Sequence, residues 1–216
     1  MAATEASYDA VAAAYAEAMS GELRRKPLDR ALLTVFAEQV REAAPDSRDA
    51  PRVWDVGCGP GHVTAFLARL GLHAAGVDLS EGMVAEARKR HPDLEFGTGS
   101  MTALPAADAS WDGLVSFYSL IHMIDDADLR AALAEYRRVL ADGGLLLLAV
   151  HAGEEVRHSA QWFGAEVDVS FRFFDPDWLS AGLEQAGFTV ESLTRRQPYP
   201  GAEVATPRAY ILARAV

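Results

Sequence analysis

From residue 52 onward, short apolar runs alternate with segments of helical periodicity. Short apolar runs bounded by turn residues are typical of buried strands, and apolar residues spaced three and four apart indicate an amphipathic helix. The pattern predicts strands at 52–56, 73–77, 93–96, 111–117 and 144–151, and helices at 61–70, 81–90, 126–140 and 175–186. Such alternation predicts a mostly parallel, doubly wound, Rossmann-like α/β sheet with helices on both faces.

The two ends of the chain depart from this alternation. Two helices are predicted before the first strand, at about 4–20 and 27–44, followed by a turn-rich connector at 44–51. At the other end, strands near 188–195 and 207–214 follow each other without a helix between them. Consecutive strands joined by a turn-rich link predict an antiparallel hairpin. We therefore expect a seven-stranded sheet that ends in this hairpin.

A glycine-rich turn follows the first predicted strand. Residues 53–61 read Val-Trp-Asp-Val-Gly-Cys-Gly-Pro-Gly, and the second predicted strand leads directly into Asp78. Closely spaced glycines let the backbone turn sharply and approach a ligand. A carboxylate after the second strand can accept both hydroxyls of a ribose. Together the two features predict a site for a nucleoside-containing cofactor.

The details of the turn argue against a cofactor with phosphates. The last glycine comes one residue earlier than in the dinucleotide fingerprint G-x-G-x-x-G, and no Arg or Lys occurs between Val53 and Ala68. With its acidic partner Asp78, the sequence Asp55-Val-Gly-Cys-Gly-Pro-Gly61 resembles the first two motifs of the class I S-adenosylmethionine-dependent methyltransferases. The resemblance extends over about residues 8–216.

This resemblance implies S-adenosylmethionine as the cofactor and assigns roles to residues that follow each strand. The glycine loop would surround the methionine half, Asp55 would shape that loop, Asp78 would bind the ribose, and Met101 would cover the adenine. The implied cofactor-binding residues are Tyr8, Tyr15, Asp55, Gly57, Cys58, Gly59, Gly61, Asp78, Leu79, Met83, Gly99, Ser100, Met101, Ser116 and Phe117. A core role for Met83, and simple helix packing for Tyr8 and Tyr15, are equally good interpretations. Ser100 stands where many family members have an acid.

Two histidines lie at the predicted carboxyl edge of the sheet. His151 follows the fifth strand and is the first candidate for a general base, with His122, after the fourth strand, as the second. The alternative for each is a histidine that packs or bonds a backbone carbonyl. The spacing of these histidines does not indicate a metal site.

Composition narrows the class of partner and compartment. The net charge of −11 and the short basic clusters disfavour a nucleic-acid substrate. The single cysteine, Cys58, suits a reducing compartment, and no apolar run reaches the ~20 residues of a membrane span. We expect a cytoplasmic protein.

The aromatic residues of segment 152–174 predict either a lid over an apolar or aromatic substrate or the contact of a homodimer.

The predicted organisation is one domain of 216 residues, with an N-terminal helical cap (1–45), a cofactor-binding core (52–151), a substrate lid (152–174) and a C-terminal helix and hairpin (175–216). The predicted function is transfer of a methyl group from S-adenosylmethionine to oxygen or nitrogen of a small molecule, such as a secondary metabolite. A non-catalytic S-adenosylmethionine-binding module is an open alternative. An NAD-dependent oxidoreductase is disfavoured by the glycine spacing, the terminal hairpin and the lack of a Tyr-x-x-x-Lys pair.

Overall fold

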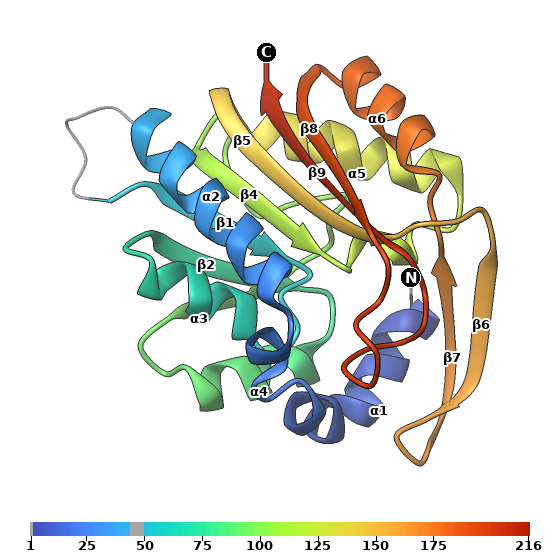
Figure 1. The fold of residues 1–216 in the computed structure, drawn as a ribbon. Helices are drawn as coiled ribbons and strands as arrows, with labels where there is room; N and C mark the ends of the chain where they lie inside the picture. The colour runs from blue at the N-terminus through green and yellow to red at the C-terminus, as the bar shows by residue number, and fades with distance from the viewer. Residues whose placement is uncertain (1, 44–49) are drawn as a thin grey trace.

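The computed structural model describes residues 2–43 and 50–216, so most of the predicted connector at 44–51 lies outside the described residues. Seven strands form one sheet in the order β3-β2-β1-β4-β5-β9-β8 (Figure 1). The strands are β1 (Arg52–Val56), β2 (His73–Asp78), β3 (Glu95–Thr98), β4 (Trp111–Phe117), β5 (Leu140–His151), β8 (Phe188–Arg196) and β9 (Arg208–Ala215). Strands β1 to β5 pair in parallel, and β9 is antiparallel to β5 and β8. The predicted mostly parallel sheet with a C-terminal hairpin is confirmed.

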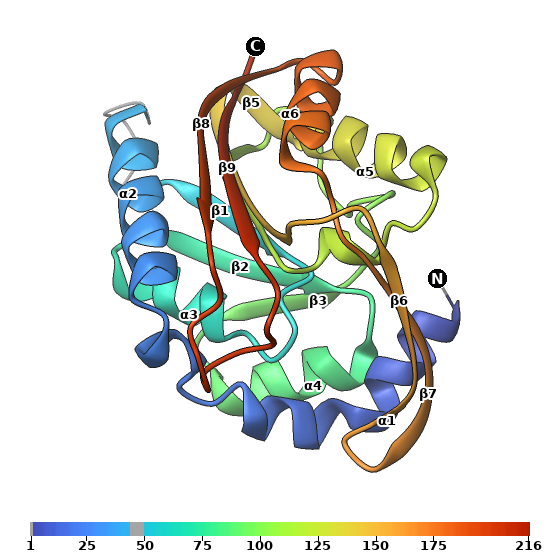
Figure 2. The same ribbon diagram turned by 45° about the vertical axis from the view of Figure 1, so that its right-hand side comes forward.

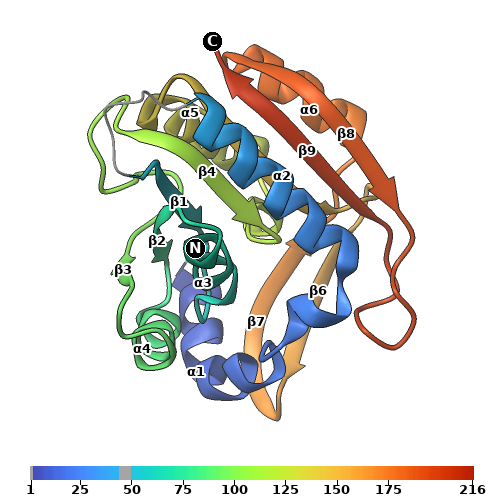
Figure 3. The same ribbon diagram turned by 60° about the vertical axis from the view of Figure 1, so that its left-hand side comes forward.

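Helices cover both faces of this sheet. Helices α2 (Pro27–Ala43) and α3 (His62–Arg69) pack on one face, and α5 (Asp126–Val139) and α6 (Pro176–Gln185) pack on the other (Figure 3). Helix α4 (Glu81–Arg90) packs on β2 and β3. No helix in the described ranges is both long and apolar enough to cross a membrane.

The two N-terminal helices have different places. In α2, the buried residues Leu33, Phe36, Ala37 and Val40 recur at helical spacing and face apolar side chains of β1, β4 and β5. Helix α2 is therefore a layer of the sheet core. Helix α1 (Ala2–Ala18) lies instead at one end of the sheet, against α4, and the short helix η1 (Glu22–Arg25) joins the two (Figure 2).

The segment predicted as a lid contains a second, two-stranded sheet. Strands β6 (Val156–Trp162) and β7 (Ala165–Arg172) form an antiparallel hairpin beside α1 (Figure 2). Val167 and Val169 of β7 pack with Val11 and Ala12 of α1 and with Met83 of α4. The hairpin and α1 thus form one layer, which lies at the carboxyl ends of the parallel strands.

Candidate active site

The glycine loop between β1 and α3 has a backbone that only glycine adopts readily. Gly57, Gly59 and Gly61 have φ values of 74°, 52° and 79°. At Gly57 a Cβ atom would lie 2.7 Å from Oγ of Ser119 and still closer to its Cβ. At Gly61 it would lie 2.6 Å from the ring of Phe96. The loop therefore packs against its neighbours with bare main chain.

Two buried acids hold the loop. The carboxylate of Asp78, at the end of β2, accepts hydrogen bonds from the backbone N–H of Gly59 (2.8 Å) and of Ser80 (2.9 Å). Asp55 accepts a 2.7 Å bond from the hydroxyl of Thr64 in α3. Burial raises the pKa of Asp78, against the lowering effect of the backbone amides of Ser80, Gly59 and Leu79, and raises the pKa of Asp55 to about 6. A carboxylate has about four acceptor positions, so Asp78 keeps free lone pairs for a ligand.

The wall after β4 includes a strained residue and a buried serine. Tyr118 has φ of 58°, a conformation that is rare for a bulky residue. Ser119 donates a 2.6 Å hydrogen bond to the carbonyl of Val56, which ties this wall to the end of β1. Backbone strain of this kind is often found at functional sites.

His122, in the short helix η2 (Leu120–His122), has a defined tautomer. Its Nδ1 lies 3.1 Å from the carbonyl oxygen of Ser170, and its Nε2 lies 2.9 Å from the hydroxyl of Tyr8. A carbonyl only accepts hydrogen bonds, so Nδ1 carries the proton and Nε2 accepts from Tyr8. Burial lowers the pKa of His122 to about 4, which keeps the ring neutral at neutral pH.

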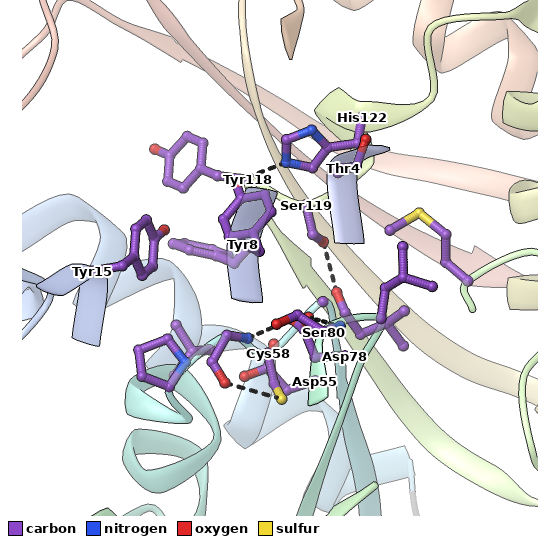
Figure 4. Close-up of a pocket in the computed structure, with 18 of the residues that line it drawn as sticks. Thr4, Tyr8, Tyr15, Asp55, Cys58, Asp78, Ser80, Tyr118, Ser119 and His122 are labelled. Carbon is purple, nitrogen blue, oxygen red and sulfur yellow. Dashed lines mark hydrogen bonds between the residues drawn. The ribbon is translucent and has the colours of Figure 1, made fainter. Parts of the chain in front are cut away.

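Helix α1 lines the cavity with Tyr8 and Tyr15. Figure 4 shows Tyr8 pointing toward His122, with Asp55 and Asp78 on the far side of the cavity. Asp9 anchors the helix to α4 by accepting hydrogen bonds from Oγ of Ser80 (2.5 Å) and the backbone N–H of Gly82 (2.9 Å). On the hairpin side, the backbone N–H of Asp168 donates a 2.8 Å bond to Oγ of Ser7.

Most of the residues predicted for the site line this one cavity. They are Tyr8, Tyr15, Asp55, Gly57, Cys58, Gly59, Asp78, Leu79, Gly99, Met101, Phe117 and His122. Four predicted residues lie near it but not on its surface: Gly61 caps α3, Met83 is fully buried against α1 and β7, Ser100 bonds Thr102, and Ser116 is buried against Ser119 and Tyr136.

His151, the first candidate for a general base, also lies outside the cavity lining. Its Nδ1 is 2.7 Å from the hydroxyl of Thr206, and its ring stacks on Phe173 with centroids 5.0 Å apart. Burial, reinforced by the positive charge of Arg208, lowers the pKa of His151 to about 3. The contacts of His151 therefore fit the alternative of a packed, hydrogen-bonded histidine.

Several lining residues were not predicted from the sequence. They are Thr4, Glu5, Val56, Pro60, His62, Val63, Ser80, Tyr118 and Ser119. Pro60 and His62 are within or next to the glycine motif, and Ser80 follows Asp78 as the N-cap of α4, so motif spacing carried a signal for them. For Thr4 and Glu5 the sequence carries none, because their place depends on how α1 packs. Among residues 2–43 and 50–216, no group of three His, Cys, Asp or Glu side chains could hold a metal ion.

Comparison with known proteins finds a family match over part of the chain. Residues 53–144, from β1 into β5, match the methyltransferase domain family. This part of the chain is similar to a methyltransferase domain. A demethylmenaquinone methyltransferase of Beutenbergia cavernae is 36% identical to the chain over 130 residues, which are 58% of this chain and 53% of that protein. An O-methyltransferase of Penicillium expansum is 31% identical over 154 residues, which are 66% of this chain and 53% of that protein. The chain spans about half the length of the curated relatives it matches.

A solved methyltransferase structure has the same fold as this chain. The 1,6-didemethyltoxoflavin N1-methyltransferase of Burkholderia thailandensis has a TM-score of 0.73 and 20% identity, and covers 98% of this chain and 87% of its own. That structure holds 1,6-didemethyltoxoflavin and S-adenosylhomocysteine. The similarity includes α1 and the β6–β7 hairpin region, because it extends over nearly the whole chain.

Proposed function

We propose that this chain is an S-adenosylmethionine-dependent methyltransferase that acts on oxygen or nitrogen of a small molecule. The observation that carries the proposal is the charge of the cavity. Of the described residues that line it, Glu5, Asp55 and Asp78 are acidic and none is Lys or Arg. A sulfonium cation is attracted to such a lining, whereas the pyrophosphate of NAD would be repelled by it.

The residues of the cavity fit this cofactor. The free lone pairs of Asp78 suit the two ribose hydroxyls, the bare main chain of Gly57 and Gly59 allows close approach, and the thioether of Met101 adapts to an aromatic base. When bound, S-adenosylmethionine supplies an electrophilic methyl group on a sulfur that keeps the electron pair of the broken bond. Nε2 of His122, which is neutral and faces the cavity, is the group able to take a proton from an acceptor hydroxyl.

Calorimetric titration with S-adenosylmethionine and with NAD tests the proposal. We expect S-adenosylmethionine to bind the wild type and NAD to give no heat. Asp78→Ala removes two charge-assisted hydrogen bonds to the ribose and should weaken binding by about one hundredfold. Asp93→Ala, at an exposed turn, is the matched control and should bind like the wild type. Binding of NAD instead, or equal binding by Asp78→Ala, would contradict the assignment.

A second measurement separates an enzyme from a module that only binds the cofactor. If the chain is an enzyme, His122→Gln should keep the affinity for S-adenosylmethionine and lower kcat on a hydroxyl acceptor by about 10²–10⁴-fold. Cofactor binding without turnover on any oxygen or nitrogen acceptor would favour the binding module.

A further inference from the structure

Tyr8 of α1 is enclosed by three aromatic rings from three different parts of the chain. Its ring centroid lies 5.7 Å from that of Tyr15, 5.5 Å from that of Trp162 and 5.2 Å from that of His122. All three neighbours meet it edge to face, with interplanar angles of 78°, 83° and 82°. We call Tyr15, Trp162 and His122 the aromatic box. Edge-to-face contacts of this kind select a flat aromatic ring.

The aromatic box has one polar feature, and it matches the hydroxyl of a phenol. The Tyr8 hydroxyl donates to Nε2 of His122, whose other nitrogen is fixed by the Ser170 carbonyl. The box therefore combines a slot for a flat ring with a neutral imidazole at the place where the ring carries its hydroxyl. Tyr15 and His122 of the box line the cavity that also holds the glycine loop and Asp78 (Figure 4).

We propose that Tyr8 occupies the site of the methyl acceptor, and that the acceptor is a small molecule with a phenolic hydroxyl. This inference rests on the proposed methyltransferase function and adds the chemical class of the substrate. The acceptor takes the place of the Tyr8 side chain, with its ring in the aromatic box and its hydroxyl on Nε2 of His122. As the phenol oxygen forms its bond to the methyl carbon, its proton passes to Nε2, and the imidazolium then releases that proton to solvent.

The chemistry of His122 favours a phenol over other acceptors. A buried imidazole is a weak base, so it can take a proton only from an acidic donor. A phenolic hydroxyl has a pKa of about 10, whereas water, and an aliphatic alcohol like it, lies near 16. An aromatic amine fits the slot in shape, but its N–H is a weaker hydrogen-bond donor to Nε2 of His122 than a phenolic O–H. The hydroxyl of a phenol thus satisfies both the shape and the proton acceptor of the box.

Binding of 4-methylphenol, which is the tyrosine side chain itself, tests the site without turnover. Tyr8→Ala empties the aromatic box, so calorimetry should show 4-methylphenol binding to this variant at least about tenfold more tightly than toluene, which lacks the hydroxyl. His122→Gln in the Tyr8→Ala background should reduce this preference. Trp178→Ala in the Tyr8→Ala background, which removes an exposed aromatic side chain of α6 outside the box, is the control and should keep the preference for 4-methylphenol. Equal binding of 4-methylphenol and toluene to Tyr8→Ala would overturn the inference.

Turnover by the wild type needs no variant to fold. With S-adenosylmethionine, we expect methylation of 4-methylphenol and none of 4-methylaniline or cyclohexanol, measured by mass spectrometry of the products. Methylation of the amine alone would refute the phenol while leaving the methyltransferase function in place. Failure of S-adenosylmethionine to bind in calorimetry would refute the proposed function instead, and the comparison of 4-methylphenol with toluene would still decide whether the box selects a phenol.

Discussion

Replacing Gly57 by alanine tests the packing of the glycine loop against the wall after β4. The left-handed φ of 74° costs an alanine about 1–2 kcal/mol. The new Cβ would also overlap Ser119, which cannot move away freely because its hydroxyl donates to the Val56 carbonyl and contacts the buried hydroxyl of Ser116 at 2.8 Å. Overpacking of this kind costs about 1–3 kcal/mol more. We therefore expect Gly57→Ala to lower the free energy of unfolding by about 2–5 kcal/mol.

Gly143 provides the matched control for the backbone effect. It has nearly the same φ, 78°, but a Cβ there would meet no atom within 4 Å. Urea unfolding followed by circular dichroism should show a loss of about 1–2 kcal/mol for Gly143→Ala, which leaves the overlap with Ser119 as the difference. Adding Ser119→Gly to Gly57→Ala should recover that difference as a coupling energy of about 1–3 kcal/mol. Equal losses for the two alanine variants, together with an additive double mutant, would refute the reasoning.

Two further predictions concern buried ionisable groups. Asp29 is fully buried, pairs with Arg196 at 2.9 Å and accepts a 3.0 Å hydrogen bond from Tyr210. In urea unfolding, Asp29→Ala should therefore lower the free energy of unfolding by about 3–5 kcal/mol. Asp177→Ala, in an exposed pair with Arg195, should change it little. His122 has a folded pKa of about 4, below its ordinary 6.5, so the unfolded state takes up its proton first and stability falls as the pH drops from 6.5 toward 4. Between pH 7.5 and pH 5, His122 should lower the free energy of unfolding by about 2 kcal/mol, and this loss should be absent in His122→Gln. Equal pH dependence of the two proteins would contradict this. Asp55, whose pKa is raised to about 6, titrates in both proteins and cancels in the comparison.

The sheet, and the part of the site around the glycine loop, can be predicted from local sequence, because the residues of this part lie next to apolar strands. Asp55, the glycines and Asp78 directly end or follow buried strands, so their place at the carboxyl edge is fixed once the strands are known. The β6–β7 hairpin gives no such signal. Most residues of β6 are exposed on both faces, so apolar and polar positions do not alternate along it.

The two histidines show what local sequence leaves open. His122 lies in the turn after β4 and His151 is the last residue of β5, and the sequence predicts both at the functional edge. The direction of each ring depends on distant partners: Tyr8 and Ser170 turn His122 into the cavity, and Thr206 and Phe173 hold His151 away from it. These partners are 48 or more residues away in three of the four cases, so no spacing rule ranks one histidine above the other.

One wall of the cavity is backed by buried charged groups, and another is formed by helix α1. Behind Tyr118, the buried groups Asp29, Arg196 and Tyr210 join α2, β8 and β9 through hydrogen bonds that are costly to break. Helix α1 buries Ser7, Val11, Ala12 and Ala16, and the hydrogen bonds of Asp9 and Ser7 hold it to α4 and β7. The Tyr8–His122 hydrogen bond belongs to the α1 wall and also occupies the proposed proton acceptor. If the acceptor is a phenol, its binding must break that bond, so entry of the acceptor and displacement of Tyr8 are a single event.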